Sequence, residues 1–240
     1  MSVEKSHSES VKVKVIDLGT ISYVRGYELQ EHYHQKVRDG ELAGVILMLE
    51  HNPVLTLGKH SDPSMILATD SELKESHVDR VNTDRGGEVT AHMPGQLVIY
   101  PILPLVKLGL QARAYVNALM QAVIETLAVW DIKARCDSQY PGVWVENRKI
   151  CAVGVRIRER VSLHGIALNV NNSLDLFERI VPCGISHLGV TSMAKELGRT
   201  IVMEQLRVEL LERLDRRLGV PLDLESRLSP TESAPRDCQV

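Results

Sequence analysis

The segment from residue 149 to residue 185 constrains the fold more than any other part of the chain. Its first half holds two apolar runs, at residues 150–157 and 161–170, whose lengths and compositions are typical of buried strands. Residues 143–145 precede the first run and predict a hairpin with it. After the second run, a short helix leads into a loop that contains Cys183. The segment therefore predicts a sheet that is followed by a tight loop with a cysteine.

Apolar periodicity over the rest of the chain predicts further strands that alternate with helices. Strands are expected at residues 11–16, 45–50, 54–58, 78–82 and 96–103, and helices at 22–38, 71–75, 112–130, 174–180 and 202–218. No internal repeat and no linker separates two cores, so the sequence predicts a single α/β or α+β domain. This domain is expected to span residues 11–222, between a flexible tail at 1–10 and a disordered tail at 223–240.

Composition and charge exclude several classes of protein. The chain has 240 residues, of which 44% are apolar, and it can therefore bury a sizeable core. A net charge of −3 and an aromatic share of 4% argue against a nucleic-acid-binding protein. The four cysteines lack the short spacing of a zinc site or a redox motif, so no metal is expected. A polar start without a signal-peptide pattern, and no apolar run near ~20 residues, predict a cytoplasmic protein that does not enter membranes.

Cys183 and Lys149 are the candidate catalytic pair. A thiol is a strong nucleophile only as a thiolate, and a free cysteine with a pKa of about 8.5 is largely protonated at neutral pH. An ammonium about 4 Å from the sulfur, at an effective dielectric constant of about 20, would lower that pKa by as much as ~3 units. Our hypothesis is that the fold brings these two side chains together. Taken alone, a buried inert cysteine and a surface lysine are the commoner roles.

Four sequence motifs occur in a fixed order. They are Arg-Gly-Gly-x-x-Thr-x-His-x-Pro-Gly-Gln at residues 85–96, Lys-Ile-x-x-x-Gly at 149–154, His-Gly-x-Ala-Leu-Asn at 164–169 and Pro-Cys-Gly-Ile at 182–185. Together they resemble the bacterial octanoyl-[acyl-carrier-protein]:protein N-octanoyltransferases, or lipoyl(octanoyl) transferases, of the lipoate/biotin protein ligase superfamily. The resemblance covers residues 11–217 and implies a mixed β-sheet flanked by helices.

The resemblance also implies roles for individual residues. Cys183 would carry the acyl group as a thioester, and Lys149 would lower the pKa of its thiol. The substrate site would be lined by Arg85, Gly86, Gly87, Glu88, Val89, Thr90, Ala91, His92, Ala152, Val153, Gly154, Gly165, Ile166 and Ala167. His164 and Asn169 are secondary candidates. The two histidines, His92 and His164, are equally well read as bases, substrate contacts or hydrogen-bonded structural residues.

The implied partners are octanoyl-acyl carrier protein, as the donor, and lipoyl domains of 2-oxoacid dehydrogenase E2 subunits or the glycine cleavage H protein, as acceptors. Because a thioester is converted to an amide, no ATP and no other cofactor is expected, and the protein is expected to be a monomer. Acyl carrier proteins are acidic, so a local basic rim is expected from the arginines around the hairpin, Arg148, Arg156, Arg158 and Arg160. The alternative is an ordinary solvated edge.

Two positions depart from the expected pattern. Met93 stands where the family has a glycine, and its side chain could change the shape of the pocket and the preferred acyl length. Cys151 stands where a plain small residue is expected, and it could be a second oxidisable thiol near the site. Gly154 and Gly165 are candidates for presenting backbone N–H groups to an oxyanion.

Three other functions fit parts of the pattern. An ATP-dependent lipoate–protein ligase shares the scaffold and the lysine motif but has no need of a nucleophilic thiol at position 183. A non-catalytic module could bind carrier or lipoyl domains without chemistry. A cysteine hydrolase is disfavoured, because water would have to compete with the lysine amine.

Overall fold

A large mixed sheet forms the centre of the molecule. The computed structural model describes residues 12–137, 139–181 and 189–228. The sheet contains β1 (Val13–Ile21), β2 (Val45–His51), β6 (Gln96–Ile102), β7 (Arg135–Cys136), β8 (Val143–Val145), β9 (Arg148–Arg158), β10 (Val161–Asn169), β11 (Gly189–Val190) and β12 (Leu222–Leu228). The strand order is β12-β1-β2-β6-β10-β9-β8-β7, with β11 paired to β9. β1 runs parallel to both of its neighbours, whereas β2, β6, β10, β9 and β8 are antiparallel in succession.

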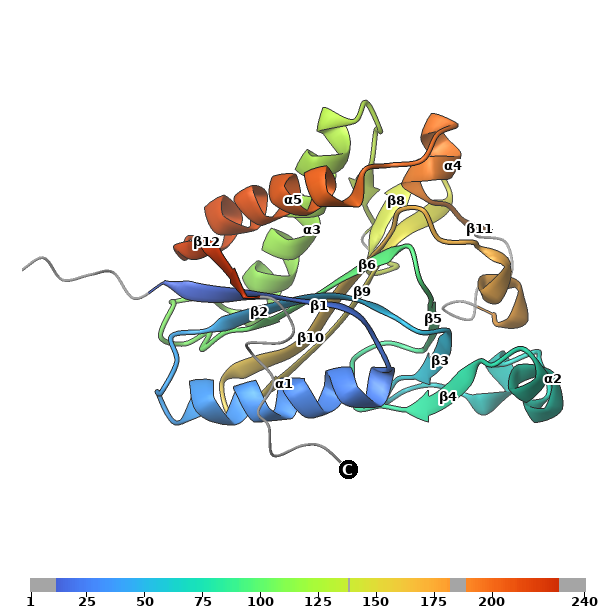
Figure 1. The fold of residues 1–240 in the computed structure, drawn as a ribbon, viewed down its shortest axis with the longest axis horizontal. Helices are drawn as coiled ribbons and strands as arrows, with labels where there is room; N and C mark the ends of the chain where they lie inside the picture. Colours follow the sequence, from blue (N-terminus) through green and yellow to red (C-terminus); the bar gives the residue numbers. More distant parts are fainter. Residues whose placement is uncertain (1–11, 138, 182–188, 229–240) are drawn as a thin grey trace, which may run out of the picture.

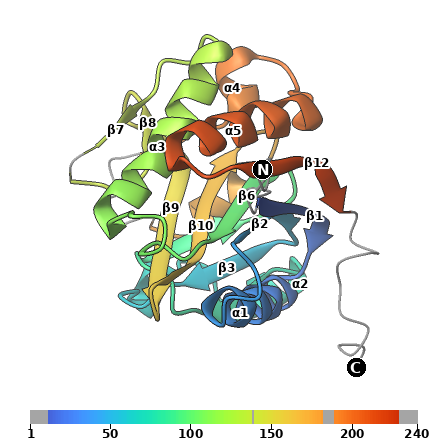
Figure 2. The same cartoon turned by 90° about the vertical axis from the view of Figure 1, so that its left-hand side faces the viewer.

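Helices cover both faces of this sheet, as Figure 1 and the turned view in Figure 2 show. Helix α1 (Tyr23–Arg38) packs on one face through Leu29 and Val37, which lie at helical spacing. Helices α3 (Ala112–Val129) and α5 (Met203–Leu218) lie together on the opposite face. The side chains of these two helices form one apolar core with β6 and β10. The predicted mixed sheet with flanking helices is therefore confirmed.

A smaller sheet, with the order β4-β3-β5, stands beside the large one (Figure 1). Its strands are β3 (Val54–Leu57), β4 (Asp79–Asn82) and β5 (Val89–His92). It carries the short helices η1 (Pro63–Met65), α2 (Asp70–Glu75) and η2 (Asp175–Arg179), and α4 (Met193–Leu197) precedes α5. The short turn at residues 93–95 joins β5 directly to β6. The small sheet is thereby held against the edge of the large one.

The C-terminal strand extends further than the sequence predicts. β12 pairs in parallel with β1, beginning at Leu222 opposite Val13. It continues to Leu228, beyond the expected end of the domain at residue 222. The expected N-terminal tail at 1–10 lies outside the described residues, as do residues 229–240 of the C-terminal tail expected at 223–240.

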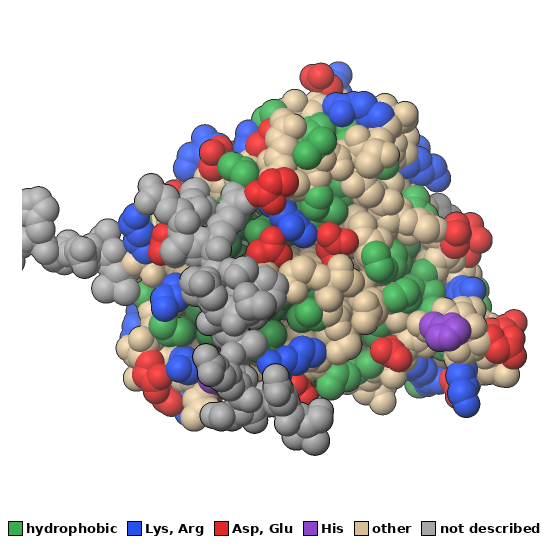
Figure 3. Space-filling model, in the orientation of Figure 1, with side chains coloured by type: hydrophobic (Ala, Val, Ile, Leu, Met, Phe, Trp, Pro, Cys, Tyr) green, Lys and Arg blue, Asp and Glu red, His purple; other side chains and the backbone are tan. Residues whose placement is uncertain are grey.

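The surface mixes charges of both signs. On the face shown in Figure 3, Lys and Arg side chains are interspersed with Asp and Glu side chains. In the described part of the chain, no helix has the length and apolarity needed to cross a bilayer.

Candidate active site

A cavity of about 360 Å³ lies where the small sheet meets β9 and β10. Its wall is formed by the loop at residues 85–88, by β5 and by the facing strands β9 and β10. The antiparallel register places Gly154 opposite Gly165 and Ala152 opposite Ala167. These residues have little or no side chain, so the two central strands leave room for a ligand between themselves and β5.

Most of the residues expected at the substrate site surround this cavity. Those that line it are Arg85, Gly87, Glu88, Val89, Thr90, His92, Lys149, Ala152, Val153, Gly154, His164, Gly165, Ile166, Ala167 and Asn169. Gly86 and Ala91 are the two expected residues in the described part of the chain that are not part of the wall. Cys183, the expected nucleophile, lies outside the described residues.

Lys149 stands at one end of the cavity and is 9% exposed. Its Nζ lies 4.8 Å from the centre of the Trp144 ring, over the ring face, which stabilises an ammonium. β11 begins directly after residues 182–188 and pairs with β9, with Val190 opposite Lys149. The Thr191 N–H also donates to the Lys149 carbonyl at 3.0 Å. The chain that follows the cysteine motif therefore runs alongside Lys149.

Arg85 is buried, and its guanidinium holds the loop that contains it in place through hydrogen bonds. Its Nη2 donates to the Thr56 carbonyl and to the Glu88 carbonyl, both at 2.6 Å, and its Nη1 donates to the Gly86 carbonyl at 3.0 Å. Its Nε donates to the Thr56 hydroxyl at 3.1 Å. The guanidinium thus ties the loop at residues 85–88 to β3. Arg85 also lines the cavity, where the sequence motif predicts a substrate-site residue.

A chain of hydrogen bonds fixes the tautomer of His92. The Gln96 amide nitrogen donates to Ala91 O at 3.2 Å and to Asn169 Oδ1 at 2.9 Å. Gln96 Oε1 must therefore accept from His92 Nδ1, 2.7 Å away. Burial lowers the pKa of His92 well below its ordinary value. The ring is thus neutral at physiological pH, with its proton on Nδ1. Asn169 Oδ1 accepts from the Gln96 amide and so fixes the orientation of that amide.

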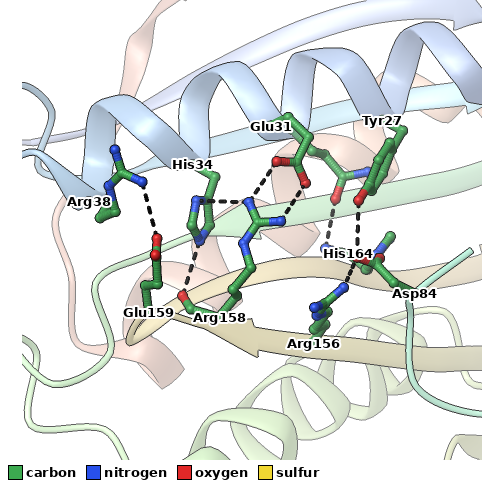
Figure 4. Close-up of polar contacts among 10 residues, drawn as sticks. Tyr27, Glu31, His34, Arg38, Asp84, Arg156, Arg158, Glu159 and His164 are labelled. Carbon is green, nitrogen blue, oxygen red and sulfur yellow. Dashed lines mark hydrogen bonds and ion pairs between the residues drawn. The ribbon is translucent and has the colours of Figure 1, made fainter. Parts of the chain in front are cut away.

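His164 belongs to a polar network that links α1 to β9 and β10, shown in Figure 4. Asp84 Oδ1 lies 2.7 Å from His164 Nε2, and Asp84 Oδ2 accepts from the Tyr27 hydroxyl at 3.0 Å. Arg156 pairs with the same carboxylate. Burial lowers the pKa of His164, and Arg85 and Arg156 lower it further. Because Arg156 offsets the charge of Asp84, the His164 ring is neutral near pH 7.

The expected basic rim is largely neutralised within the molecule. Arg148 pairs with Glu146 and Glu196. Figure 4 shows the pairs of Arg156 with Asp84 and of Arg158 with Glu31. For these three arginines the alternative, a charge-paired solvated edge, describes the structure better. The fourth, Arg160, has positive φ at the turn between β9 and β10.

Two further expectations are corrected by burial. Cys151 is fully buried in the main core, and burial raises the pKa of its thiol to about 12, so it is not an oxidisable thiol at the site. Met93 is not among the residues that line the cavity; it is buried in the apolar cluster that also holds Phe177, a residue of the cavity wall, and Ile180.

The glycine pair has a packing role. A Cβ at Gly165 would lie 2.1 Å from the Ile99 carbonyl on β6, and one at Gly154 would lie 3.1 Å from the Gly86 carbonyl. Gly154 is also about 17 Å along β9 from Lys149, at roughly 3.3 Å per residue. The two glycines therefore form the floor of the cavity rather than an oxyanion site beside Lys149.

Several cavity residues lie outside the segments that the sequence analysis assigned to the site. They are Tyr23, Gln96, Tyr100, Gln139, Tyr140, Pro141, Phe177 and Val190. Gln96 closes the first motif, and its position there was a usable signal. Tyr23 begins α1 and Tyr100 lies within β6, where no local pattern distinguishes them from core residues. Among the described residues, no group of three or more His, Cys, Asp or Glu side chains is arranged to hold a metal ion.

Comparisons with known proteins agree with this geometry. The family described as "Lipoyl protein ligase A/B catalytic domain" matches residues 22–215. An octanoyltransferase of Chloroflexus aggregans is 43% identical over 203 residues, which cover 83% of this chain and 92% of that protein. One of Myxococcus xanthus is 42% identical over 200 residues, which cover 81% of this chain and only 56% of that protein. These relatives confirm the resemblance drawn from the four motifs and the predicted class of enzyme.

Solved structures share the fold. The crystal structure of lipoate-protein ligase A bound with ATP superposes with a TM-score of 0.71 at 14% identity, covering 91% of this chain and 89% of that one. A bi-partite lipoate protein ligase from Thermoplasma acidophilum gives a TM-score of 0.68 at 13% identity, covering 91% and 87%. At such identities the likeness extends to the fold alone.

Proposed function

Because the chain belongs to the lipoyl protein ligase A/B catalytic domain family and its curated relatives are octanoyltransferases, we propose that it moves an octanoyl group from octanoyl-acyl carrier protein to a lysine of a lipoyl domain. The acceptor is the lipoyl domain of a 2-oxoacid dehydrogenase E2 subunit or the glycine cleavage H protein. The product is an octanoylated protein, the first intermediate of endogenous protein lipoylation. The enzyme acts as a monomer, without ATP.

The observation that carries this proposal is the cavity between Lys149 and His164. It is lined mainly by apolar side chains and backbone, and it has a cation at one end. Burying the hydrocarbon of an octanoyl group in such a cavity is worth up to ~5 kcal/mol, at about 0.8 kcal/mol per methylene. An acyl chain in this cavity would have its thioester carbonyl at the Lys149 end, where the reaction takes place.

In the first half-reaction the Cys183 thiolate attacks the thioester carbonyl. A bond forms between its sulfur and the acyl carbon, the bond from that carbon to the carrier's sulfur breaks, and the Lys149 ammonium gives the departing thiolate its proton. The motif Pro-Cys-Gly-Ile, which resembles the octanoyltransferase motif and lies within the residues that the family matches, supports Cys183 as the nucleophile. The pairing of Val190 with Lys149 supports its approach, because it brings the chain that follows this motif next to the lysine.

In the second half-reaction the neutral amine of the lipoyl-domain lysine attacks the acyl-enzyme. An amide bond forms, the bond from the acyl carbon to Cys183 breaks, and the amine proton passes to the now neutral Lys149. The regenerated ammonium stabilises the departing Cys183 thiolate. Proton and charge are therefore restored after each turnover.

Intact-mass measurement tests the thioester. Incubation with octanoyl-acyl carrier protein, without ATP, should add one octanoyl group that hydroxylamine removes, and Cys183→Ala should abolish the adduct. Cys151→Ala is the matched control and should retain it, because that thiol is buried and protonated. Product that forms only with ATP would identify a ligase instead. An unmodified protein that still binds either domain would identify a binding module.

A further inference from the structure

Lys149 reaches the cavity because β9 contains a bulge directly after it. In the hairpin of β8 and β9, Trp144 lies opposite Lys149. Val143 lies opposite Cys151, so the register shifts by one residue and Ile150 is the extra residue of β9. Residues two apart share a face of a regular strand, and Lys149 would then point with Cys151 into the main core. The bulge instead leaves Ile150 and Cys151 in that core and turns Lys149 into the cavity wall.

The same register brings the Trp144 ring to Lys149. Val143 and Val145 point into the main core, so Trp144 between them points to the other face of β8, as Lys149 does on β9. The Lys149 Nζ lies over the ring, 4.8 Å from its centre. Of these two described residues, Lys149 lines the cavity and Trp144 does not. The ring therefore contacts the lysine without forming part of the cavity wall.

Both side chains are held in place and largely shielded from water. The Trp144 Nε1–H donates to the Tyr140 carbonyl at 3.0 Å, and Trp144 is 3% exposed. Gly142 borders the stem of the lysine, since a Cβ at this glycine would lie 3.3 Å from Lys149 Cε. Lys149 itself is 9% exposed. Water competes weakly for an ammonium at such a site, so the attraction between the ammonium and the ring is near the upper end of its usual range.

We propose that Trp144 is a positioning residue for Lys149: its ring holds the ammonium at the reacting end of the cavity, in the direction that the bulge at Ile150 sets. The inference rests on the proposed function, in which the Lys149 ammonium sustains the Cys183 thiolate. Lysine has a long, flexible stem, so an ammonium without the ring would spend part of its time away from this position. A weaker attraction should therefore lower the reactivity of Cys183, although both reacting groups remain in the protein.

Fluorinated tryptophan tests the ring while nearly preserving its shape. Fluorine withdraws electron density from the ring face and so weakens its attraction for a cation. The chain has two tryptophans, so Trp130→Phe produced with monofluorinated or tetrafluorinated tryptophan carries the label at Trp144 alone. Mass spectrometry of the Cys183 peptide gives the rate of its modification by iodoacetamide as a function of pH. The pH midpoint should rise with each degree of fluorination, and the tetrafluorinated protein should react about three- to tenfold more slowly at neutral pH.

The matched control is Trp144→Phe produced with tetrafluorinated tryptophan. Its label lies at Trp130, whose ring faces Arg199 at 5.2 Å, and its pH midpoint should equal that of unlabelled Trp144→Phe. A general loss of packing would lower the Tm but would not follow the degree of fluorination.

A midpoint that fluorination at Trp144 leaves unchanged, while Lys149→Ala raises it, would overturn the positioning role. An equal shift from the label at Trp130 would also overturn it. If the wild-type Cys183 reacts no faster than a free cysteine, or if Lys149→Ala leaves its midpoint unchanged, the proposed catalytic pair fails and the role of Trp144 fails with it.

Discussion

Replacement of Arg85 tests whether its side chain stabilises the loop at residues 85–88 or binds substrate. Arg85 is 7% exposed, and its guanidinium donates to the carbonyls of Thr56, Gly86 and Glu88. Arg85→Met keeps much of the apolar stem but removes every one of these donors. Arg85→Lys keeps the charge but cannot reproduce the planar fork. We expect both variants to loosen the loop at residues 85–88, Met more than Lys.

The size of the effect follows from the acceptors that lose their donor. The carbonyl of Thr56, a fully buried residue, would be left unpaired, which costs ~1–3 kcal/mol. The Gly86 and Glu88 carbonyls are reachable by water after a local rearrangement, so each costs roughly 0.5–1 kcal/mol. Removal of a buried charge recovers part of this loss. The net destabilisation of Arg85→Met is about 2–4 kcal/mol, which lowers the Tm by about 5–15 °C in a chain of this size.

Thermal unfolding followed by circular dichroism measures this loss, and steady-state octanoyl transfer measures its effect on KM. Arg80→Met is the matched control, because Arg80 lies on β4 of the same small sheet and its one ion pair with a described residue is to the exposed Asp70. It should change stability by less than about 0.5 kcal/mol. If Arg85→Met melts like the wild-type protein and yet loses activity, the guanidinium acts on substrate and the reasoning from its hydrogen bonds is wrong.

Two other variants test the packing and the buried histidines. Gly165→Ala should destabilise the protein by several kcal/mol in urea unfolding, on the order of ~3, because its Cβ would lie 2.1 Å from the Ile99 carbonyl. Gly189→Ala, whose Cβ would meet only a side-chain carbon at 3.4 Å, should be mild, and equal effects would refute the packing argument. Burial lowers the pKa of His51 to about 4. Below pH ~6.5 the unfolded chain therefore binds a proton at His51 that the folded protein does not bind. The free energy of unfolding should fall by about 3 kcal/mol between pH 6.5 and 4 for this reason. His51→Gln should remove about this share of the acid dependence of stability, while the share that comes from the buried His92 and His164 should remain. The exposed His60→Gln should leave the dependence unchanged, and an unaltered slope in His51→Gln would refute the contribution of His51.

Local signals predicted much of the fold. Ser22 was expected at the start of the first helix, and its hydroxyl accepts from the Arg25 N–H at the N-terminus of α1. Residues 45–49 form a continuous apolar run, and all nine residues of Val161–Asn169 are buried, because both strands lie in the interior of the large sheet. Each of these patterns involves residues that are close together in the chain, so it can be recognised in the sequence without knowledge of the fold.

What the sequence missed depends on distant partners. β12 reads as a polar tail, and its pairing with β1 joins the two ends of the described chain. Arg85 lies in a recognisable motif, but only the fold shows that its donors reach Thr56 on β3. In the sequence, the hairpin arginines predict a basic rim. In the fold they form ion pairs with Glu31, Asp84 and Glu196, which come from other parts of the chain. Charge in a sequence therefore predicts a binding surface poorly where opposite charges can pair across the fold.

The two central strands join parts of the cavity that come from different sequence motifs. β9 begins beside Lys149 and β11, and it reaches the partner of His164 on β10 only after passing the glycine pair. Under the proposed function, an acyl chain that reacts beside Lys149 would therefore contact residues from motifs that lie apart in the sequence. The hydrogen bonds between the antiparallel strands β9 and β10 hold these motifs at fixed positions relative to one another.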